Sequence, residues 1–366
     1  MDAKRKSVAN VPNLRFPSFE GEWIETNFGS ACKIATGNKN TQDKEEDGIY
    51  PFYVRSSTIE RINTYTFDGE AILTAGDGVG VGKVFHYTKG KIGVHQRVYI
   101  LSGFKDFVGH FLFYYFSTKF RQRVSKLSAK NSVDSVRYDM IAKMPLIYPE
   151  RHEQTNISGF LSLLDERIST QSKIIGDLSS LMNGETARLL SQTARLKRKT
   201  ALDGWELKKI KDVLTIGSGK DYRHLKSGSI PVLGSGGLMT YVDSFLYEGE
   251  TVCIGRKGTI NKPIFHEGKL WTVDTLFYTY LFKHTFPKYI YYVFKTINWK
   301  EYSEASGVPS LSKSTIENIK IPIPSLEEQN AITNYLTAIE RKIELEQKLL
   351  SEYKRQKIYL LRNLFI

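Results

Sequence analysis

Apolar residues recur at alternating steps of four and three along two long stretches of the chain. Ten such positions can be followed in each stretch, and eight of the ten are apolar in both. These apolar positions are Ile157, Leu161, Leu164, Ile168, Ile175, Leu178, Met182 and Leu189 in the first stretch, and Ile332, Leu336, Ile339, Ile343, Leu350, Tyr353, Leu360 and Leu364 in the second. The heptad spacing predicts two long coiled-coil helices, at 150–199 and 325–366.

Both predicted helices have a defined start. Pro149 and Pro324 prevent a helix from continuing from upstream, because proline lacks the backbone N–H and clashes with the preceding turn. Acidic residues follow in each first turn, where the helix dipole favours negative charge. Ser325 and Glu328 have the spacing of a capping box.

Short strand-like runs alternate with turns in the segment before each helix. In 19–149 these runs are 71–74, 83–87 and 94–101, followed by an aromatic segment of helical character at 107–126. In 200–324 the same order recurs, with runs at 251–254, 263–266 and 272–282 before a similar aromatic segment at 288–302. Each segment predicts a mixed α/β domain, and residues 1–18, with Pro12 and Pro17, predict an arm.

Landmarks of the first half recur in the second half at an offset of about 180 residues. The paired landmarks are Trp23 and Trp205, Gly48 and Gly228, Pro51 and Pro231, Tyr114 and Tyr291, and Gln154 and Gln329. A repeat of this length predicts two homologous domains related by a pseudo-two-fold axis, which would lay the two helices antiparallel. The predicted fold class is therefore α+β, with two mixed α/β domains separated by two long antiparallel coiled-coil helices.

A weaker second apolar stripe lies off the coiled-coil seam at equivalent places in both helices. Its members are Phe160, Leu163 and Ile174 in the first helix, and Tyr335, Ala338 and Leu349 in the second. Two helices alone bury only one face each, so either a globular domain or another subunit must cover this stripe. The equivalence of the two halves favours a symmetric pair of partners.

The charge of the chain points to a polyanionic partner. Its 52 Lys and Arg residues outnumber 39 Asp and Glu, giving a net charge of +13. Such an excess favours nucleic acid, although a merely basic soluble protein is the alternative. The longest apolar aromatic run, 111–116, is far shorter than a membrane span, and no secretory signal follows the charged amino terminus. These observations predict a cytoplasmic protein with no membrane partner.

Polar and basic residues in the predicted turns are the candidates for contacts with base edges or phosphates. In the first domain these are Arg55, Ser56, Ser57, Lys83, His95, Gln96, Arg97, Lys130 and Asn131. In the second domain they are Lys220, Arg223, His224, Ser235, Arg256, Lys257 and Asn261. An ordinary strand end with solvated polar side chains is the alternative at each position.

The two domains differ at these turns. The paired positions are Gly76-Asp77 with Arg256-Lys257, and Val94-His95-Gln96 with Val273-Asp274-Thr275. Two unlike sets of hydrogen-bonding groups predict two unlike DNA half-sites. A basic cluster, Arg195, Lys197, Arg198 and Lys199, ends the first helix. It suits either DNA phosphates or simply the negative end of the helix dipole.

No motif for catalysis is recognisable. The glycine-rich run 76–83 has neither the spacing of a phosphate-binding loop nor its final Ser or Thr. The histidines and the two cysteines show no zinc-ligand spacing, which predicts no metal site. The motifs of serine hydrolases, of adenine methyltransferases and of DNA motors are also missing from the sequence. We therefore expect that the chain itself is not an enzyme and that it binds no cofactor.

The whole chain resembles the specificity (S) subunit of type I restriction–modification systems. The resemblance rests on the repeated domain-plus-helix order, on residues 14–23 (LRFPSFEGEW) and on residues 321–329 (IPIPSLEEQ). The first helix is preceded by a weaker copy of the second motif, at 144–154. The family implies two target-recognition domains, at 19–149 and 200–324, that each read half of a split double-stranded DNA site. It also implies that the helices act as spacers.

The resemblance further implies the partners of the chain. Two modification (methyltransferase) subunits would dock on the helices, at residues such as Phe160, Leu163, Ile174, Tyr335 and Leu349, and nuclease/translocase restriction subunits would join them. S-adenosylmethionine, ATP and Mg²⁺ would then be bound by these partners. Two alternatives remain open: a self-contained DNA-acting enzyme with an unrecognised site, and a two-headed coiled-coil adaptor with a ligand other than nucleic acid.

Overall fold

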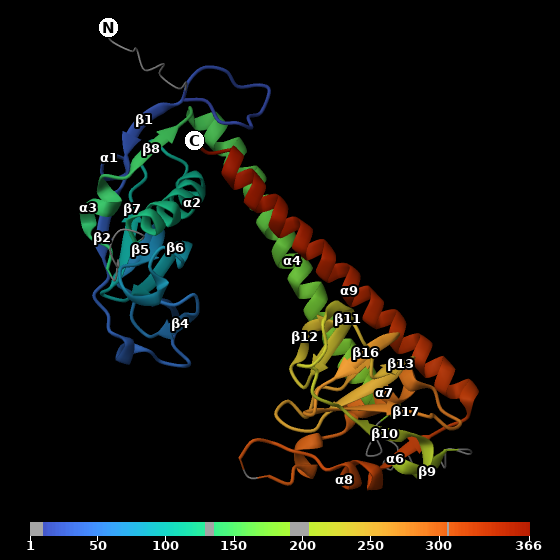
Figure 1. Ribbon diagram of the computed structural model, residues 1–366. Coiled ribbons are helices and arrows are strands. Elements are labelled where there is room, and N and C mark those ends of the chain that lie inside the picture. Colours follow the sequence, from blue (N-terminus) through green and yellow to red (C-terminus); the bar gives the residue numbers. More distant parts are fainter. Residues whose placement is uncertain (1–9, 129–134, 191–204, 306) are drawn as a thin grey trace. The chain divides into compact units, whose positions relative to one another are not determined.

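The computed structural model describes residues 10–128, 135–190, 205–305 and 307–366. The chain divides into two compact units. Unit 1 comprises Met1–Gln171 with Leu349–Ile366, and unit 2 comprises Ser172–Lys348. Each unit therefore contains one of the predicted domains together with a part of both predicted long helices, which are green and red in Figure 1.

Unit 1 is built on a six-stranded sheet with the strand order β2-β7-β5-β6-β3-β4. The strands are β2 (Lys33–Thr36), β3 (Tyr50–Tyr53), β4 (Ile59–Ile62), β5 (Phe67–Ala75), β6 (Phe85–Val94) and β7 (Val98–Ser102). All neighbours run antiparallel except β3 and β6, which are parallel. A separate antiparallel pair joins β1 (Ile24–Asn27) to β8 (Pro145–Tyr148).

The predicted aromatic helix of unit 1 is α2 (Gly109–Ser128), which Figure 1 shows alongside the sheet. Its Phe111, Phe116 and Phe120 are fully buried and belong to one core with Ile72 of β5 and Leu101 of β7. This aromatic content therefore serves packing. The other short elements are α1 (Phe28–Ala31), α3 (Tyr138–Ala142) and the 3₁₀ turns η1 (Thr41–Asp43) and η2 (Gly78–Gly80).

Unit 2 has the same strand pairings divided between two four-stranded sheets. One has the order β10-β17-β14-β15 and the other β12-β11-β16-β13. The strands are β10 (Thr215–Ser218), β11 (Ser227–Gly234), β12 (Gly237–Val242), β13 (Tyr247–Glu248), β14 (Thr251–Gly255), β15 (Ile264–His266), β16 (Lys269–Thr272) and β17 (Leu276–Tyr280). Here β11 and β16 form the parallel pair, as β3 and β6 do in unit 1.

Two further similarities connect the units. The antiparallel pair β9 (Glu206–Lys209) and β18 (Lys320–Ile323) corresponds to β1 and β8. The second aromatic helix, α7 (Pro287–Thr296), buries Tyr289, Tyr292 and Phe294. The remaining short elements are α6 (Ile210–Val213), η3 (Trp299–Tyr302) and α8 (Lys313–Asn318). The predicted α+β class with two mixed domains is confirmed.

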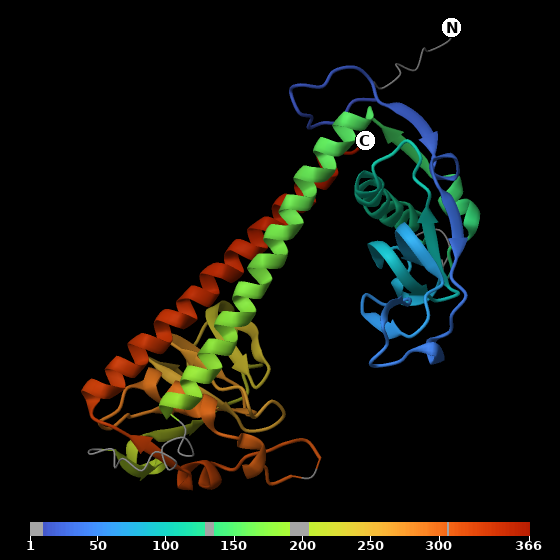
Figure 2. The same cartoon turned by 180° about the vertical axis from the view of Figure 1, so that it is seen from behind.

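The two long helices are α4 (Arg151–Leu190) and α9 (Leu326–Asn363). Every residue of the predicted heptad series is buried or half-buried in the structure, including polar Gln171 and Glu346. In unit 1 the start of α4 packs on the end of α9, as Leu161 and Leu364 show; in unit 2 Met182 near the end of α4 shares a core with Leu336. Figure 2 shows the two helices side by side, and within each unit they run in opposite directions.

A buried glutamine anchors the start of each long helix. Gln154 donates to the carbonyl of Pro149 at 2.9 Å and accepts from the backbone N–H of Val108 at 3.0 Å. Gln329 likewise donates to the carbonyl of Pro324 at 3.0 Å. Both side chains are 1% exposed or less, so each fastens a helix to its own globular domain. No helix in the described parts of the chain is long and apolar enough to cross a membrane.

Candidate nucleic-acid interface

Three segments of unit 1 are joined by backbone hydrogen bonds beside predicted DNA contacts such as Arg97. Gly76 donates to the carbonyl of Arg97 at 2.8 Å and accepts from the N–H of Val136 at 2.7 Å. Asp77 forms an isolated antiparallel bridge with Ser135. The end of β5, the β6–β7 turn and the segment before α3 are thereby held together.

Arg55, Asp77 and Arg97 form one ionic cluster at this junction. The Nη1 atom of Arg55 lies 3.0 Å from one carboxylate oxygen of Asp77, and Arg97 bonds the other oxygen. The two arginine side chains are 47% and 60% exposed, whereas the Asp77 side chain is only 14% exposed. Burial opposes ionisation of Asp77, but the hydrogen bonds and charges of Arg97 and Arg55 prevail and lower its pKa.

His95 lies close enough to this cluster to feel its charges and is only 4% exposed. Its Nδ1 accepts the backbone N–H of Arg97 at 3.0 Å, and its Nε2 lies 3.3 Å from the hydroxyl of Thr41. Burial, followed by the charge of Arg55, lowers the pKa of the ring. A neutral ring with both nitrogens engaged supports the turn that presents Arg97 to solvent.

The other described candidates of unit 1 are exposed. The side-chain amide of Gln96 donates to Asn40 at 2.5 Å, and the hydroxyl of Ser56 donates to a backbone carbonyl in its own turn. Ser57 lies in the same exposed turn after β3. Lys83 is the exposed residue of the turn after η2. The structure thus gathers these side chains into turns around the ionic cluster.

Unit 2 repeats the same backbone connections with different side chains. Arg256 donates its N–H to the carbonyl of Thr275 at 2.8 Å and accepts from the N–H of Leu311 at 2.8 Å. Lys257 bridges Ser310, as Asp77 bridges its serine in unit 1. The predicted substitution of Gly76-Asp77 by Arg256-Lys257 is therefore confirmed in three dimensions.

The predicted alignment of the neighbouring turn was wrong by one residue. The sequence comparison paired Val94 with Val273. In the structure Val273 is the counterpart of His95, because each donates its N–H at 3.0 Å to the equivalent neighbouring strand. Thr275 is then the counterpart of Arg97. The shared valine misled the alignment because the loops of the two domains differ in length.

The candidates of unit 2 line two neighbouring depressions. One, of ≈ 710 Å³, includes Arg223, Ser235 and Asp274 in its lining, and the other, of ≈ 460 Å³, includes Arg256 and Lys257. The Arg256 guanidinium lies 5.8 Å from the ring centre of Phe277, which orients it by a cation–π contact. Both depressions are open surfaces bearing polar groups.

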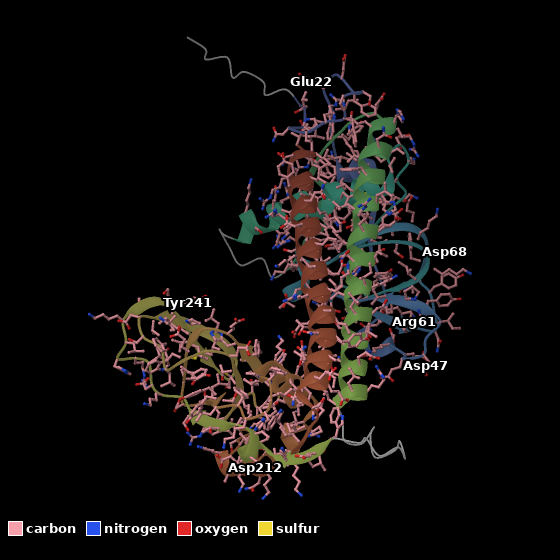
Figure 3. The ribbon with its side chains drawn as sticks, turned by 90° about the vertical axis from the view of Figure 1, so that its right-hand side faces the viewer. Glu22, Asp47, Arg61, Asp68, Asp212 and Tyr241 are labelled. Atoms are coloured by element: carbon pink, nitrogen blue, oxygen red, sulfur yellow. The ribbon has the colours of Figure 1, made fainter. Side chains whose placement is uncertain are left out.

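Three further candidates lie on exposed parts of the same loops. The ring of His224 contacts Trp271 edge-on at 5.8 Å, and the indole N–H of Trp271 donates to the carbonyl of Lys220 at 2.8 Å. Asn261 is exposed on the loop after β14. Figure 3 shows Tyr241 of β12 at the rim of unit 2. Lys130, Asn131, Arg195, Lys197, Arg198 and Lys199 lie outside the described residues.

Sequence reasoning missed several residues at these surfaces. Asp77 was not among the predicted contacts, yet it is central to the ionic cluster. Val79, at 93% exposure, projects from η2, and Leu238 and Met239 are 56% and 54% exposed beside Ser235. The sequence did offer a signal for Val79, because it is an apolar residue within a glycine-rich turn. An apolar side chain at such a place can contact the thymine methyl group.

The predicted partner-facing residues are exposed on both long helices. Phe160, Leu163 and Ile174 of α4 are 40%, 61% and 38% exposed, and Tyr335 and Leu349 of α9 are 46% and 39% exposed. Phe160 is also touched edge-on by Phe16 of the arm, with ring centres 5.9 Å apart. An apolar surface is therefore present at equivalent places in both units.

Comparison with known proteins identifies the repeat. The family described as the type I restriction modification DNA specificity domain matches residues 20–178 and again residues 202–355. The chain belongs to this family. Its two copies of the specificity domain correspond to the two predicted repeats. The resemblance drawn from the sequence is thereby confirmed.

Curated relatives of this chain are described as specificity subunits of type I restriction enzymes. The chain is 25% identical to the MjaVIII specificity subunit of Methanocaldococcus jannaschii, over 94% of this chain and 92% of the relative. Identity to the EcoDI specificity subunit of Escherichia coli is 26%, over 42% of this chain and 34% of the relative.

Solved structures share the fold. The S subunit of a type I restriction–modification system from M. genitalium superposes with a TM-score of 0.69 at 18% identity, covering 97% of this chain and 99% of that one. A chain from a solved type I restriction–modification assembly gives a TM-score of 0.57 at 14% identity, covering 94% and 97%.

Proposed function

We propose that this chain is the DNA-recognition subunit of a type I restriction–modification complex and reads an asymmetric, bipartite double-stranded DNA site. Each unit would read one half-site through its loop cluster in the major groove, where base pairs present distinct donor and acceptor patterns. The observation that carries this proposal is the shared backbone frame at Gly76 and Arg256, which presents different side chains in the two units. The net charge of +13 supports attraction to phosphates.

The chain itself would supply recognition, and its partners would supply the chemistry. Two modification subunits would dock on the exposed apolar residues of α4 and α9, and restriction subunits would complete the nuclease. S-adenosylmethionine, ATP and Mg²⁺ would be bound by those partners, in the cytoplasm. Among the described residues no group of His, Cys, Asp or Glu is arranged to hold a metal ion.

Methylation mapping tests this function directly. In cells that carry the chain with its modification subunit, adenine methylation should occur at two unlike half-sites separated by a non-specific gap, and it should vanish when the chain is deleted. The purified chain alone should transfer no methyl group. A palindromic motif, or methylation by the isolated chain, would contradict the proposal.

The proposed docking of modification subunits can be tested by introducing negative charge into the apolar surface of the long helices. Replacing Phe160 or Tyr335 by aspartate should weaken the binding of a modification subunit, because each change puts a carboxylate into an apolar contact. Ser169→Asp, which adds a carboxylate at an exposed position of α4 on the side of the helix opposite Phe160, is the matched surface control. Co-purification that is unchanged in the Phe160 and Tyr335 variants would show that the partners bind elsewhere.

A further inference from the structure

We propose that Asp77 is a positioning residue that sets the base preference of unit 1, by holding Arg55 and Arg97 as a fixed pair of guanine readers. The inference rests on the proposed function and adds to it a residue that determines specificity. Asp77 contributes through the two arginines rather than by its own contact with DNA.

The geometry gives Asp77 this role because it joins three separate turns. Arg55 follows β3, Asp77 follows β5 and Arg97 follows β6. Each carboxylate oxygen is engaged by a different guanidinium, at 3.0 Å in the case of Arg55. A guanidinium has five N–H donors, so using one of them on Asp77 leaves a fork free for the two acceptors of guanine.

The backbone of both partners is fixed independently of the ion pairs. A Cβ atom built on Gly80 of η2 would lie 2.3 Å from the carbonyl oxygen of Arg55, so the turn after Asp77 packs directly on the Arg55 backbone. Arg97 is tied through its own N–H to buried His95. The ion pairs therefore restrain side chains whose backbones are already in place, which is the property of a pre-organised reader.

A carboxylate facing DNA is otherwise unfavourable. It repels phosphates and cancels part of the attraction supplied by the two cations. Direct reading of cytosine by Asp77 is disfavoured by geometry, because both of its oxygens already accept from arginine and its side chain is only 14% exposed. The arrangement is explained if the restraint of the two guanidiniums outweighs the attraction for phosphates that Asp77 cancels. A guanidinium that is already held in place loses less conformational entropy when it binds DNA.

Unit 2 shows what the same three positions become in a different reader. By the shared backbone frame, Ser235 stands for Arg55, Lys257 for Asp77 and Thr275 for Arg97. Each cation has become a neutral hydroxyl, and the anion has become a cation. A Cβ atom on Gly258 would lie 3.3 Å from the Ser235 hydroxyl, so these turns also meet in unit 2. The charges change together, as expected of positions that act as one set.

The test uses the complete complex with its modification subunits and the variants Asp77→Asn and Asp77→Ala. Half-site preference is read by methylation mapping, and affinity for random-sequence DNA is measured against salt. Asp68→Asn is the matched control, because the change removes the same charge from β5, the strand that Asp77 follows. Asp68 stands at the outer margin of unit 1 in Figure 3.

We expect Asp77→Asn to reduce discrimination at one or two base pairs of the first half-site by roughly tenfold, the range of one bidentate contact. Asp77→Ala should reduce it further, because asparagine can still accept one hydrogen bond. Affinity for random DNA should rise or stay equal, as in Asp68→Asn, and the second half-site should not change. Arg55→Lys and Arg97→Lys should relax the same base pairs, because lysine keeps the charge but lacks the fork.

Three outcomes would overturn the inference. An unchanged first half-site in Asp77→Asn would remove any role in specificity. A lower unfolding temperature with weaker binding to all DNA would reduce Asp77 to a structural residue. Relaxation of different base pairs by the arginine variants would uncouple them from Asp77. The proposed function fails separately, if the unaltered complex methylates no bipartite motif.

Discussion

Trp23 and Trp205 occupy equivalent places in units 1 and 2 but have different hydrogen-bonding environments. The indole N–H of Trp205 donates to Glu328 at 2.8 Å. The indole N–H of Trp23 is buried and has no hydrogen-bond partner within the described residues. The equivalent carboxylate, Glu153, instead accepts from Nε and Nη2 of Arg15, at 2.8 and 2.7 Å. In unit 1 the arm has taken over an acceptor that the tryptophan uses in unit 2.

The connection between aromatic helix and long helix differs in the same way. In unit 1 the hydroxyl of Tyr114 donates to Asp165 of α4 at 2.8 Å, and Lys357 of α9 supplies the opposing charge. In unit 2 the hydroxyl of Tyr292 donates to Glu340 at 3.0 Å, and the cation is Lys288 of α7 itself. Two homologous domains have thus kept the position of a carboxylate and changed the source of its partner.

Among the tests of how the two units differ, exchange of a whole domain should have the largest effect, and this effect should be on DNA specificity. Replacing residues 203–318 by the matching segment of a relative should rewrite one half-site completely and leave the other intact, because each unit has its own core and loop frame. Methylation mapping of the chimera measures this. A change in both half-sites would mean that the units do not read DNA independently.

The next effect concerns Arg15. In Arg15→Ala the carboxylate of Glu153, which is 0% exposed, loses its cation, and removal of one partner from such a pair costs about 3 kcal/mol. Denaturant unfolding measures the loss of unfolding free energy, and hydrogen exchange shows whether the loss lies within unit 1. Adding Glu153→Gln should recover part of it by removing the charge. An unfolding midpoint that does not move in Arg15→Ala would show that the arm contributes no stability.

The variant Arg256→Ala tests base reading by unit 2. If Arg256 reads guanine through a bidentate contact, one base pair of the second half-site should be relaxed by about 1–3 kcal/mol. The first half-site provides the internal control in the same methylation map. Equal weakening on all sequences, with a shallower salt dependence, would assign Arg256 to the phosphates instead.

The smallest expected effect is a difference in acid stability. Burial opposes ionisation of Glu340, but the hydrogen bond and charge of Lys288 prevail, so its folded-state pKa lies below the ordinary value of 4.5. Ionised Glu340 therefore stabilises unit 2 above about pH 4.5, and this contribution, about 1 kcal/mol or less at a partly exposed site, is lost as the pH falls through the folded-state pKa. Thermal unfolding from pH 6 to 3 should show the loss, and Glu340→Gln should flatten it.

The long helices were predictable because their signal is periodic and repeated. Each buried position along the seam lies three or four residues from the next, so one misread residue does not alter the pattern. The same holds for the aromatic helices, although the predicted pairing of Tyr114 with Tyr291 was wrong by one residue: Tyr292 is the counterpart, because Tyr114 and Tyr292 each donate to the equivalent carboxylate of a long helix. Gln154 and Gln329 were recognised only as residues that recur in both halves. Their role in fastening the long helices was not predictable, because their partners are backbone groups that no side-chain pattern reveals.

The loop surfaces were predictable only in part. Their composition marked Arg55 and Arg97 as candidates, but nothing in the sequence places turns that are 42 residues apart around one carboxylate. His95 has the donor and acceptor set of a base reader, yet burial assigns it to the support of a turn. Contacts of this kind depend on strand order, which local propensity does not encode.

The backbone frame at the loop clusters bears on how new specificities evolve. Gly37 and Gly219 are positions where a Cβ atom would lie 2.1 and 2.0 Å from a carbonyl oxygen, so selection should permit no other residue at either place. The frame itself uses main-chain groups, which every substitution at Arg97 or Thr275 retains. If these side chains read bases, as proposed, a lineage carrying this gene can exchange one of them at a time without losing the fold. Saturation mutagenesis should find intolerant glycines bordering highly permissive reader positions, and host genomes should drift between methylation patterns in discrete steps.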